Sequence, residues 1–300
     1  MIDPIIFTIP GTGISVHWYG LLMAVGIFAA GYVTARGLSG RGEDPDYVWD
    51  GLVWAIPAGI IGARLWYVAN ITLGGSNYYL ANPARILYVP EGGLHFYGAV
   101  LFGGLAAFFY VRRHNLDFRL LLDAVAPALL IGQAIVRPAN YINQELYGPP
   151  TGLPWGIPIE AAHRIPPWND MVRFPEETTR FHPAFAYEMV WNFAAAGFLL
   201  WAARRFSKRL RPGALFAGWL ILAGAGRVWL EWFRPDQPRV PGTAISYSRI
   251  VAALMTLAGV IWLLLRYDVI RLSFISPGSS SYEVRPREES QPADEASGES

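Results

Sequence analysis

The chain has 300 residues, of which 53% are hydrophobic and 16% charged, and its mean hydropathy is +0.28. A soluble domain of this size carries about a quarter charged residues, so the composition favours an integral membrane protein. The net charge of +1 gives no sign of a nucleic-acid partner, and the lack of cysteine excludes disulfides, thiolate metal sites and a thiol nucleophile within the chain.

Seven apolar runs reach or approach the ~20 residues that cross ~30 Å of hydrocarbon. In chain order they are about Ile14–Arg36, Tyr47–Asn70, Leu94–Val111, Leu120–Arg137, Pro183–Ala203, Gly213–Phe233 and Ala244–Leu265. The first run lacks a basic segment before it and a small-residue cleavage site, so we expect a retained span. The sequence therefore predicts an all-α integral membrane protein with seven transmembrane helices in a domain that covers residues 1–272.

The loops on the two sides of these runs differ in charge. Twelve Lys and Arg residues fall in the loops of one side, close to the ends of the runs, against six on the other side. Because cytoplasmic loops carry the excess of Lys and Arg, we expect the N-terminus outside and the C-terminus in the cytoplasm. Residues 273–300 are rich in Ser, Pro and Glu and are expected to form a disordered cytoplasmic tail.

The longest connection, about residues 138–182, lies between the fourth and fifth runs and is external in this orientation. It is rich in Pro and aromatic residues, as in "YGPPTGLPWGIPI" and "IPPWNDMVRFP". Loops of this length are usually either functional or disordered, and the aromatic content favours an ordered one. The sequence thus predicts a small external head.

Four arginines lie inside the runs, all near the outer side: Arg64, Arg137, Arg227 and Arg249. Each costs at least ~2.5–3.5 kcal/mol near a helix centre, so each needs a partner or a purpose. One interpretation is that their side chains extend to the outer headgroups. The other is a shared anion site, which the convergence of several arginines at one depth favours.

The run "GRVWLEWFRPD" develops this second interpretation. Arg227, Glu231 and Arg234 are spaced i, i+4 and i+7, which places them on one face of a continuous helix. An Arg227–Glu231 ion pair could act as a brace between helices or as part of an anion site. The outer ends of other runs are also polar, with "HWYG" in the first and "GGLHFYG" in the third. Arginine forks beside such groups suit the phosphate of an anionic lipid.

These segments, in this order, resemble the prolipoprotein diacylglyceryl transferases of bacterial inner membranes. The resemblance covers about residues 3–266 and rests on "DPIIF", "HWYG", "GAR", "GGLHFYG", "NYINQELYG", "HP" followed by "YE", and "GRVWLEWFRPD". It implies transfer of the diacylglyceryl group of phosphatidylglycerol to the lipobox cysteine thiol of a prolipoprotein, with release of glycerol-1-phosphate. It also implies seven transmembrane helices with a periplasmic head, and neither a metal nor an organic cofactor. The nucleophile belongs to the substrate, which agrees with a chain that has no cysteine.

The resemblance also assigns roles to residues. Arg137 and Arg227 would stabilise the phosphate leaving group, and Glu231 would hold Arg227 in place. Tyr19, placed at the headgroup, and Tyr97 would complete the catalytic set. The other positions matched to phosphatidylglycerol binding are Asn140, Asn143, Glu145, Gly148, Arg234, Arg64, His182 and Glu188.

Two departures from the family pattern leave alternatives open. Tyr97 stands where the best-known members have a histidine, and with a free pKa near ~10 it suits a hydrogen-bond donor better than a base. Pro138 and Ala139 replace an expected small-residue turn, and Pro138 disfavours a helical conformation at Arg137. The chain is then either an active transferase, which the retained arginines favour, or an impaired member that binds phosphatidylglycerol or a lipoprotein. A small-anion transporter is a weaker hypothesis, because the polar residues cluster near the outer side and not at the midplane.

Overall fold

The computed structural model describes residues 2–11, 15–88, 92–234, 237–270, 281–282 and 284. The long elements in these ranges are the helices α1 (Trp18–Ser39), α2 (Asp46–Leu73), α4 (Phe96–Arg113), α5 (Phe118–Ile142), α6 (Ala184–Arg205), α7 (Ala214–Leu230) and α8 (Tyr247–Arg266). The short elements are β1 (Ile5–Thr8), β2 (Ser15–His17), α3 (Tyr78–Ala81) and the 3-10 turns η1 (Pro83–Leu87), η3 (Ala161–His163) and η4 (Glu231–Phe233). The expected helical class is confirmed, and the antiparallel β1–β2 hairpin is an element that the sequence did not predict.

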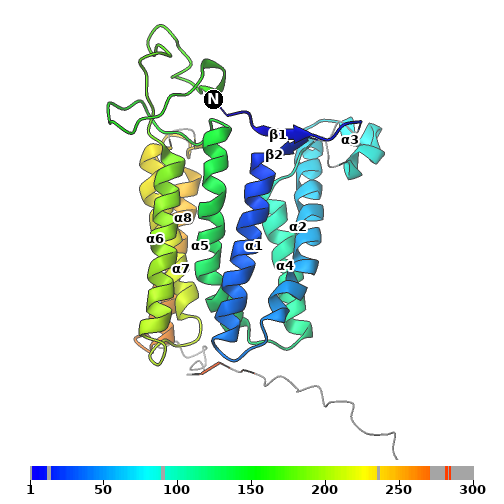
Figure 1. The fold of residues 1–300 in the computed structure, drawn as a ribbon, viewed down its shortest axis with the longest axis vertical. Coiled ribbons are helices and arrows are strands. Elements are labelled where there is room, and N and C mark those ends of the chain that lie inside the picture. Colours follow the sequence, from blue (N-terminus) through cyan, green and yellow to red (C-terminus); the bar gives the residue numbers. More distant parts are fainter. Residues whose placement is uncertain are drawn as a thin grey trace, which may run out of the picture.

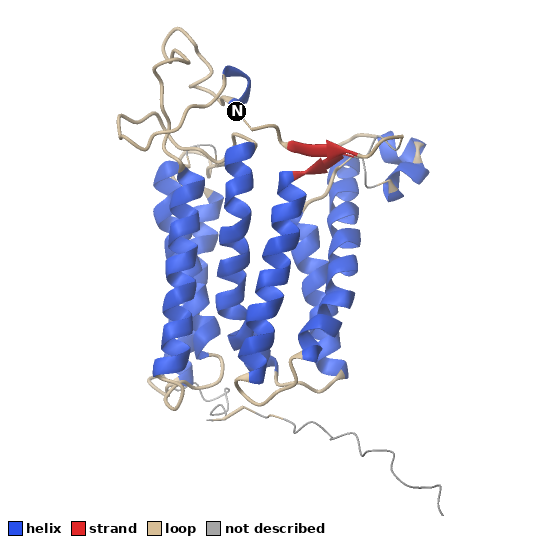
Figure 2. Cartoon of the chain, viewed as in Figure 1, coloured by secondary structure: helices blue, strands red, loops and turns tan. Residues whose placement is uncertain are grey.

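Helix α5 lies at the centre of the bundle (Figure 1). On one side it packs against α1, next to the α2–α4 pair, and on the other it packs against α6 and α7, with α8 against α7. The helices share one general direction, and the β hairpin, α3 and the α5–α6 connection lie together at one end of the bundle (Figure 2). We call this the head end, and the opposite end the far end.

Among the described residues, five helices are long and apolar enough to cross a membrane: Trp18–Ser39, Asp46–Leu73, Phe118–Ile142, Ala214–Phe233 and Tyr247–Arg266. Helices α4 and α6, also predicted as spans, are continuous helices of 18 and 22 residues. They run beside the other five (Figure 1). The more polar composition of α6 includes Glu188 and the buried Asn192. The helical class and the presence of several membrane-type helices therefore agree with the sequence interpretation.

Glycine pairs set the closest contacts between the helices. A Cβ on Gly62 would lie 2.5 Å from the Gly98 carbonyl oxygen, and a Cβ on Gly98 would lie 2.2 Å from the Gly62 oxygen. Helices α2 and α4 therefore touch through their backbones. Gly26 of α1 and Gly132 of α5 form a looser contact, with corresponding distances of 3.0 and 3.2 Å. Such contacts fit helices in lipid, which associate by close packing of small residues because lipid chains are as apolar as leucine.

The connection between α5 and α6 folds around its own small core. The buried side chains of this core are those of Tyr147, Ile159, Trp168 and Phe181. Arg164, only 6% exposed, donates to the carbonyl oxygens of Ile159 at 2.8 Å and Phe174 at 2.7 Å. Its guanidinium also lies 5.0 Å from the centre of the Phe181 ring. We call this packed connection the head.

The far end of the bundle receives part of the C-terminal tail. Most of the predicted tail, 273–300, lies outside the described residues. Tyr282 donates its hydroxyl to Asp123 Oδ2 at 2.7 Å. Tyr282 and Val284 also pack against a cluster from α1, α2 and α5 that includes Leu38. The chain therefore returns to the bundle at this point.

Candidate functional site

The sequence-predicted arginines lie at the head end of the bundle. Helices α5 and α7 run towards this end (Figure 1), and Arg137 and Arg227 lie close to where these helices stop. Helices α6 and α8 start there, and Glu188 and Ser248 lie close to their first residues. Four helices thus place these four side chains at the head end of the bundle. The common depth of Arg137 and Arg227 agrees with the position expected from the sequence.

Arg137 forms an ion pair with Glu188 that joins α5 to α6. Its Nη2 donates to Glu188 Oε1, and its Nη1 donates to Asn140 Oδ1 at 3.2 Å. The two paired side chains are 21% and 15% exposed. The Nε of Arg137 is buried and has no hydrogen-bond partner within the described residues. The described residues therefore supply no acceptor for this charged donor, which is unusual for a buried N–H.

The turn after α5 joins three more of the predicted residues. Glu145 Oε1 accepts hydrogen bonds from Asn140 Nδ2 at 2.8 Å and from Asn143 Nδ2 at 3.2 Å. The chain turns back through Gln144, whose φ of 53° lies in the left-handed region. A residue other than glycine costs of order 1–3 kcal/mol there, and such strain concentrates at functional sites. The strained turn holds the Asn–Glu network next to Arg137.

Helix α5 is not interrupted at Pro138. The sequence predicted a helix end at Arg137, but α5 continues to Ile142 with both Pro127 and Pro138 inside it. Neighbouring helices and side chains can satisfy the backbone groups that a proline frees in a membrane bundle. Ala139 is fully buried in the continuous helix, where the positive φ of glycine is not needed. The expectation that Pro138 disfavours a helical conformation at Arg137 was therefore wrong, because tertiary packing outweighs the local preference before proline.

A second network joins α7 to α8. Arg227 forms the predicted ion pair with Glu231, with Nη2 and Oε2 3.3 Å apart, and the Glu231 side chain is 4% exposed. Ser248 Oγ lies 3.0 Å from both oxygens of this carboxylate and donates to it. Ser248 Oγ also accepts from Arg227 Nη2 at 3.3 Å, and Gln237 Oε1 accepts from the same nitrogen at 3.0 Å. Arg227 is therefore oriented by three side chains.

Arg234 does not share the helix face of Arg227. Helix α7 ends at Leu230, the 3-10 turn η4 follows, and Arg234 has a non-helical φ of −131°. The expectation of one helical face through the i+7 position was wrong, because the final turn tightens to three residues per turn before the chain leaves the helix. Arg249, the remaining arginine of the predicted group, lies 5.4 Å from the centre of the Trp232 ring.

His182 and Gly148 connect the head to the helix ends. The Gly148 amide donates to the His182 carbonyl at 2.8 Å. A Cβ on Gly148 would lie 2.9 Å from both the His182 Cβ and the Phe233 carbonyl oxygen, so glycine permits this approach. The His182 Nδ1 lies 2.9 Å from the Tyr187 hydroxyl. Burial lowers the pKa of His182 below its ordinary value, which favours a neutral ring at pH 7.

Arg64 of α2 is engaged by backbone carbonyl groups. The residue is 5% exposed. Its guanidinium donates at 2.6 to 3.2 Å to the carbonyl oxygens of Arg85, Ile86, Gly92 and Gly93. These bonds tie the chain that leaves α2 to the chain that enters α4. Arg64 thereby fixes the approach to the first turn of α4.

Tyr19 and Tyr97 lie in the first turns of α1 and α4, also at the head end. They are 40% and 64% exposed. Tyr97 stacks on His95 with the ring centres 5.4 Å apart. Within the described ranges, no hydrogen bond joins either tyrosine to the Arg137 or Arg227 network. The structure thus places the tyrosines at the expected level, on the α1–α2–α4 side of α5.

Sequence reasoning missed Ser248 and Gln237. Both are uncharged, and Gln237 precedes the last long helix in an irregular segment. The sequence does contain a helix-start signal nearby, at Ser246. Its hydroxyl caps α8 by accepting a hydrogen bond from the Arg249 amide at 3.1 Å. Serine is a preferred residue at this position, so the pattern marks the start of a helix. It does not reveal that the second serine of "SYS" contacts a carboxylate on another helix.

Comparison with known proteins identifies the relatives of this chain. The family model described as prolipoprotein diacylglyceryl transferase matches residues 4–265. A relative from Chloroflexus aggregans, named phosphatidylglycerol–prolipoprotein diacylglyceryl transferase, is 35% identical over 98% of this chain and 97% of its own length. A relative of the same name from Leifsonia xyli is 39% identical over 88% of this chain and 78% of its own length. The chain therefore belongs to the prolipoprotein diacylglyceryl transferase family.

Proposed function

We propose that this protein transfers the diacylglyceryl group of phosphatidylglycerol to the lipobox cysteine thiol of a prolipoprotein. The observation that carries the proposal is the pair of arginine networks at one end of a membrane-type helix bundle. Each network holds one guanidinium against a carboxylate, Arg137 with Glu188 and Arg227 with Glu231. The relatives' names supply the substrates, phosphatidylglycerol and a prolipoprotein.

The chemistry requires stabilisation of a phosphate leaving group. The cysteine sulfur attacks the glyceryl carbon that is bonded to the phosphate oxygen, a C–S bond forms, and the C–O bond breaks. The oxygen keeps both electrons and departs as part of glycerol-1-phosphate, while the thiol proton is lost to the medium or to a nearby base. A positive field favours the thiolate over a thiol with a pKa of ~8.5. Fixed guanidinium groups stabilise the charge that develops on the phosphate.

We assign the phosphate to Arg137 and Arg227. A guanidinium has five N–H donors, so an ion pair with one carboxylate leaves donors for a ligand. Glu188 and Glu231 act as positioning residues that hold the two guanidinium groups. The other residues that we propose for binding are Asn140, Asn143, Glu145, Gly148, His182, Arg234, Arg64, Tyr19 and Tyr97.

We further propose that all seven long helices cross the membrane, within a domain of residues 1–272. The head then lies on the outer side with residues 138–182, the N-terminus lies outside, and the C-terminal residues 273–300 lie in the cytoplasm. The excess of Lys and Arg at the far end supports this orientation. Because the chain has no cysteine, single cysteines at Val172 in the head and Asn115 at the far end would report it. A membrane-impermeant thiol reagent on intact cells should label the first and not the second, and the reverse pattern would overturn the orientation.

The test of the function is release of glycerol-1-phosphate by purified protein from phosphatidylglycerol and a lipobox peptide. Replacing Arg137 or Arg227 by Gln should reduce the rate by about 10²–10³-fold, the usual effect of losing one donor to a developing oxyanion. Arg173→Gln is the matched control, since it removes one exposed head arginine and should leave the rate unchanged.

Two results would contradict the proposal. Equal rates for the wild type and the Arg137 and Arg227 variants would overturn the site assignment. Binding of phosphatidylglycerol by the wild type without release of glycerol-1-phosphate would favour the alternative, a family member that binds the lipid or a lipoprotein without catalysis.

A further inference from the structure

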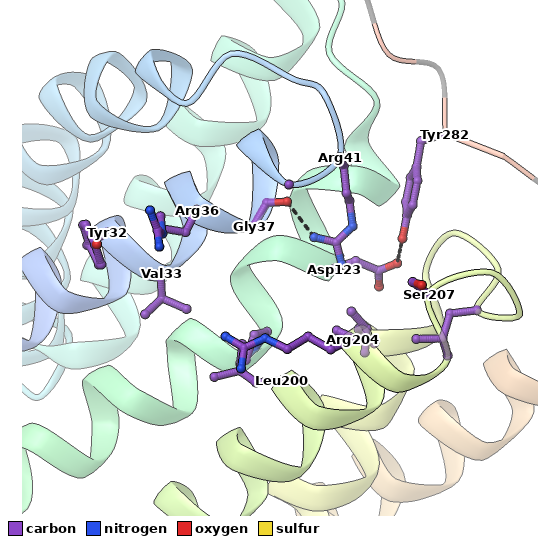
Figure 3. Close-up of a pocket in the computed structure, with 15 residues that line it drawn as sticks. Tyr32, Val33, Arg36, Gly37, Arg41, Asp123, Leu200, Arg204, Ser207 and Tyr282 are labelled. Carbon is purple, nitrogen blue, oxygen red and sulfur yellow. Dashed lines mark hydrogen bonds between the residues drawn. The ribbon is translucent and has the colours of Figure 1, made fainter.

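A polar cavity opens at the far end of the bundle, opposite the proposed transfer site. Its volume is about 630 Å³, and it lies between α1, α5 and α6 beside the turn that leads from α6 to α7 (Figure 3). Its lining includes Arg36 from α1, Arg41 from the turn after α1, and Arg204 from α6. None of these arginines takes part in the networks at the head end.

The carboxylate of Asp123 in this cavity is already satisfied. Its Oδ2 accepts from the Gly213 amide at 2.6 Å and from the Tyr282 hydroxyl at 2.7 Å. Its Oδ1 accepts from the Phe216 amide at 2.8 Å. These bonds cap the first turn of α7, and within the described lining the three arginines outnumber this single carboxylate. The lining therefore keeps an excess of positive charge.

Two of the three arginines are available to a ligand. Arg41 donates through Nη1 to the Gly37 carbonyl at 2.7 Å, so one side of its guanidinium is engaged. Arg36 lies 5.8 Å from the centre of the Tyr32 ring. Within the described part of the chain, neither Arg36 nor Arg204 has an ion pair or a side-chain hydrogen bond. The two arginines belong to different walls of the cavity, Arg36 to α1 and Arg204 to α6 (Figure 3).

Apolar side chains of α1, α5 and α6 form much of the remaining lining. Val33, Pro127 and Leu200 lie beside the arginines in the cavity wall. Helices α1 and α6 each pack against α5, and the cavity lies between them. Its volume falls in the ~300–1,000 Å³ range of small-ligand sites. Arginines above an apolar wall match a ligand with a phosphate head and hydrocarbon chains, because arginine binds phosphate oxygens in pairs.

We propose that this cavity is a second phospholipid site, which holds the phosphate of an anionic phospholipid from the leaflet at the far end. Arg36 and Arg204 bind the phosphate oxygens, and the apolar wall contacts the first carbons of the acyl chains. The site is separate from the transfer reaction and does not depend on it. A free phosphate ion shares the same head chemistry, but it would leave the apolar wall unused.

The lack of cysteine allows a local test on the full-length protein in detergent. Ser207→Cys places a single thiol in the cavity lining, and Asn115→Cys places one at the same end but outside it. Each is labelled with a small fluorophore and titrated with phosphatidylglycerol that is brominated near the glycerol end of its acyl chains. Quenching at position 207 should saturate at a lower lipid concentration than quenching at position 115. Lipid at the transfer site does not interfere, because bromine quenches only at contact and Arg137 lies roughly 20 Å along α5 from Asp123.

Paired variants assign the effect to the two arginines. In the Ser207→Cys background, Arg36→Gln with Arg204→Gln should raise the half-saturating lipid concentration by about tenfold or more, since two charged hydrogen-bond donors are lost. Arg112→Gln with Arg205→Gln removes two exposed arginines at the same end, outside the cavity lining, and should leave it unchanged. An equal effect of the two pairs, or equal quenching at both labels, would show general attraction to the surface and would overturn the proposal.

Competition separates the possible sources of the phosphate. Unlabelled phosphatidylglycerol should reverse the quenching at position 207, whereas diacylglycerol, which lacks the phosphate, should not. Reversal by inorganic phosphate at the same concentration as the lipid would identify a free-anion site and contradict a lipid site. Reversal by diacylglycerol would show an apolar groove in which the arginines take no part, and would contradict it as well.

Discussion

Arg137 and Arg227 each keep a carboxylate partner at the level where the helices end. In both pairs the carboxylate is the less exposed side chain, 15% against 21% and 4% against 23%. An uncompensated arginine within a membrane helix costs at least ~2.5–3.5 kcal/mol, and a paired anion reduces that cost. In each pair the arginine therefore keeps the larger exposed fraction of its side chain. This arrangement lowers the cost of burying each charge, and in the proposed site the exposed part of each arginine would face the anionic phosphate.

A substitution at Ser248 tests the network around Arg227 and Glu231. Its hydroxyl contacts both Glu231 and Arg227, so Ser248→Ala leaves a buried carboxylate without one of its donors. The expected loss of stability is about 1–3 kcal/mol. In a double-mutant cycle with Glu231→Gln, measured by thermal unfolding in detergent, the two changes should couple by about 0.5–3 kcal/mol. Strictly additive effects would contradict the network.

His182 gives a prediction for the dependence on pH. Its pKa in the folded protein is lowered by burial, below an ordinary value of about 6.5. Its contribution to stability is therefore fully present above pH ~6.5 and is lost as the pH falls through the folded pKa. The unfolding temperature of the wild type should fall more between pH 7.5 and pH 5 than that of His182→Gln. The same fall in both proteins would rule out His182 as a source of this dependence.

Helices and ion pairs could be predicted from the sequence where the pattern lies within one short stretch of the chain. The apolar runs locate the seven long helices, and the i, i+4 spacing predicts the Arg227–Glu231 pair. The Arg137–Glu188 pair joins residues 51 positions apart on different helices, so only the packing of α5 on α6 reveals it. Local rules failed at Pro138, where the helix continues. They also failed at Arg234, where it stops.

The contact between α2 and α4 gives a matched pair of variants. Gly98→Ala forces a Cβ to within 2.2 Å of the Gly62 carbonyl oxygen, whereas Gly104→Ala on the same helix meets no atom within 4 Å. Overpacking of this kind typically costs about 1–3 kcal/mol. Thermal unfolding in detergent should therefore show a clear loss for Gly98→Ala and little change or a small gain for Gly104→Ala. Similar values for both would mean that the helices do not touch at Gly98.

The whole molecule consists of two helix groups that meet at α5. Asp123 of α5 supplies the cap for α7, where Gly213 has no side chain to do so. The same carboxylate also accepts from Tyr282. One side chain thus connects the central helix, the second group and the C-terminal segment, although these are far apart in sequence.

Two substitutions measure this connection. Asp123→Ala removes the acceptor of two backbone amides and should cost about 2 kcal/mol or more, the upper range for a lost cap. Tyr282→Phe removes one hydrogen bond and should cost about 0.5–1.5 kcal/mol. Thermal unfolding of both variants in detergent gives the comparison. An equal or larger effect of Tyr282→Phe would show that the capping bonds contribute little.

At the base of the head, the chain that leaves α5 is hydrogen-bonded to the chain that enters α6. The Gly148 amide bonds to the His182 carbonyl at 2.8 Å, the His182 amide bonds to the Pro149 carbonyl at 3.0 Å, and the Thr151 amide bonds to the Arg180 carbonyl at 2.8 Å. This short ladder therefore helps to hold the end of α5 at a fixed distance from the start of α6. An insertion at an exposed point of the head such as Val172, which is 91% exposed, would therefore enlarge the head without moving the ion pair below it.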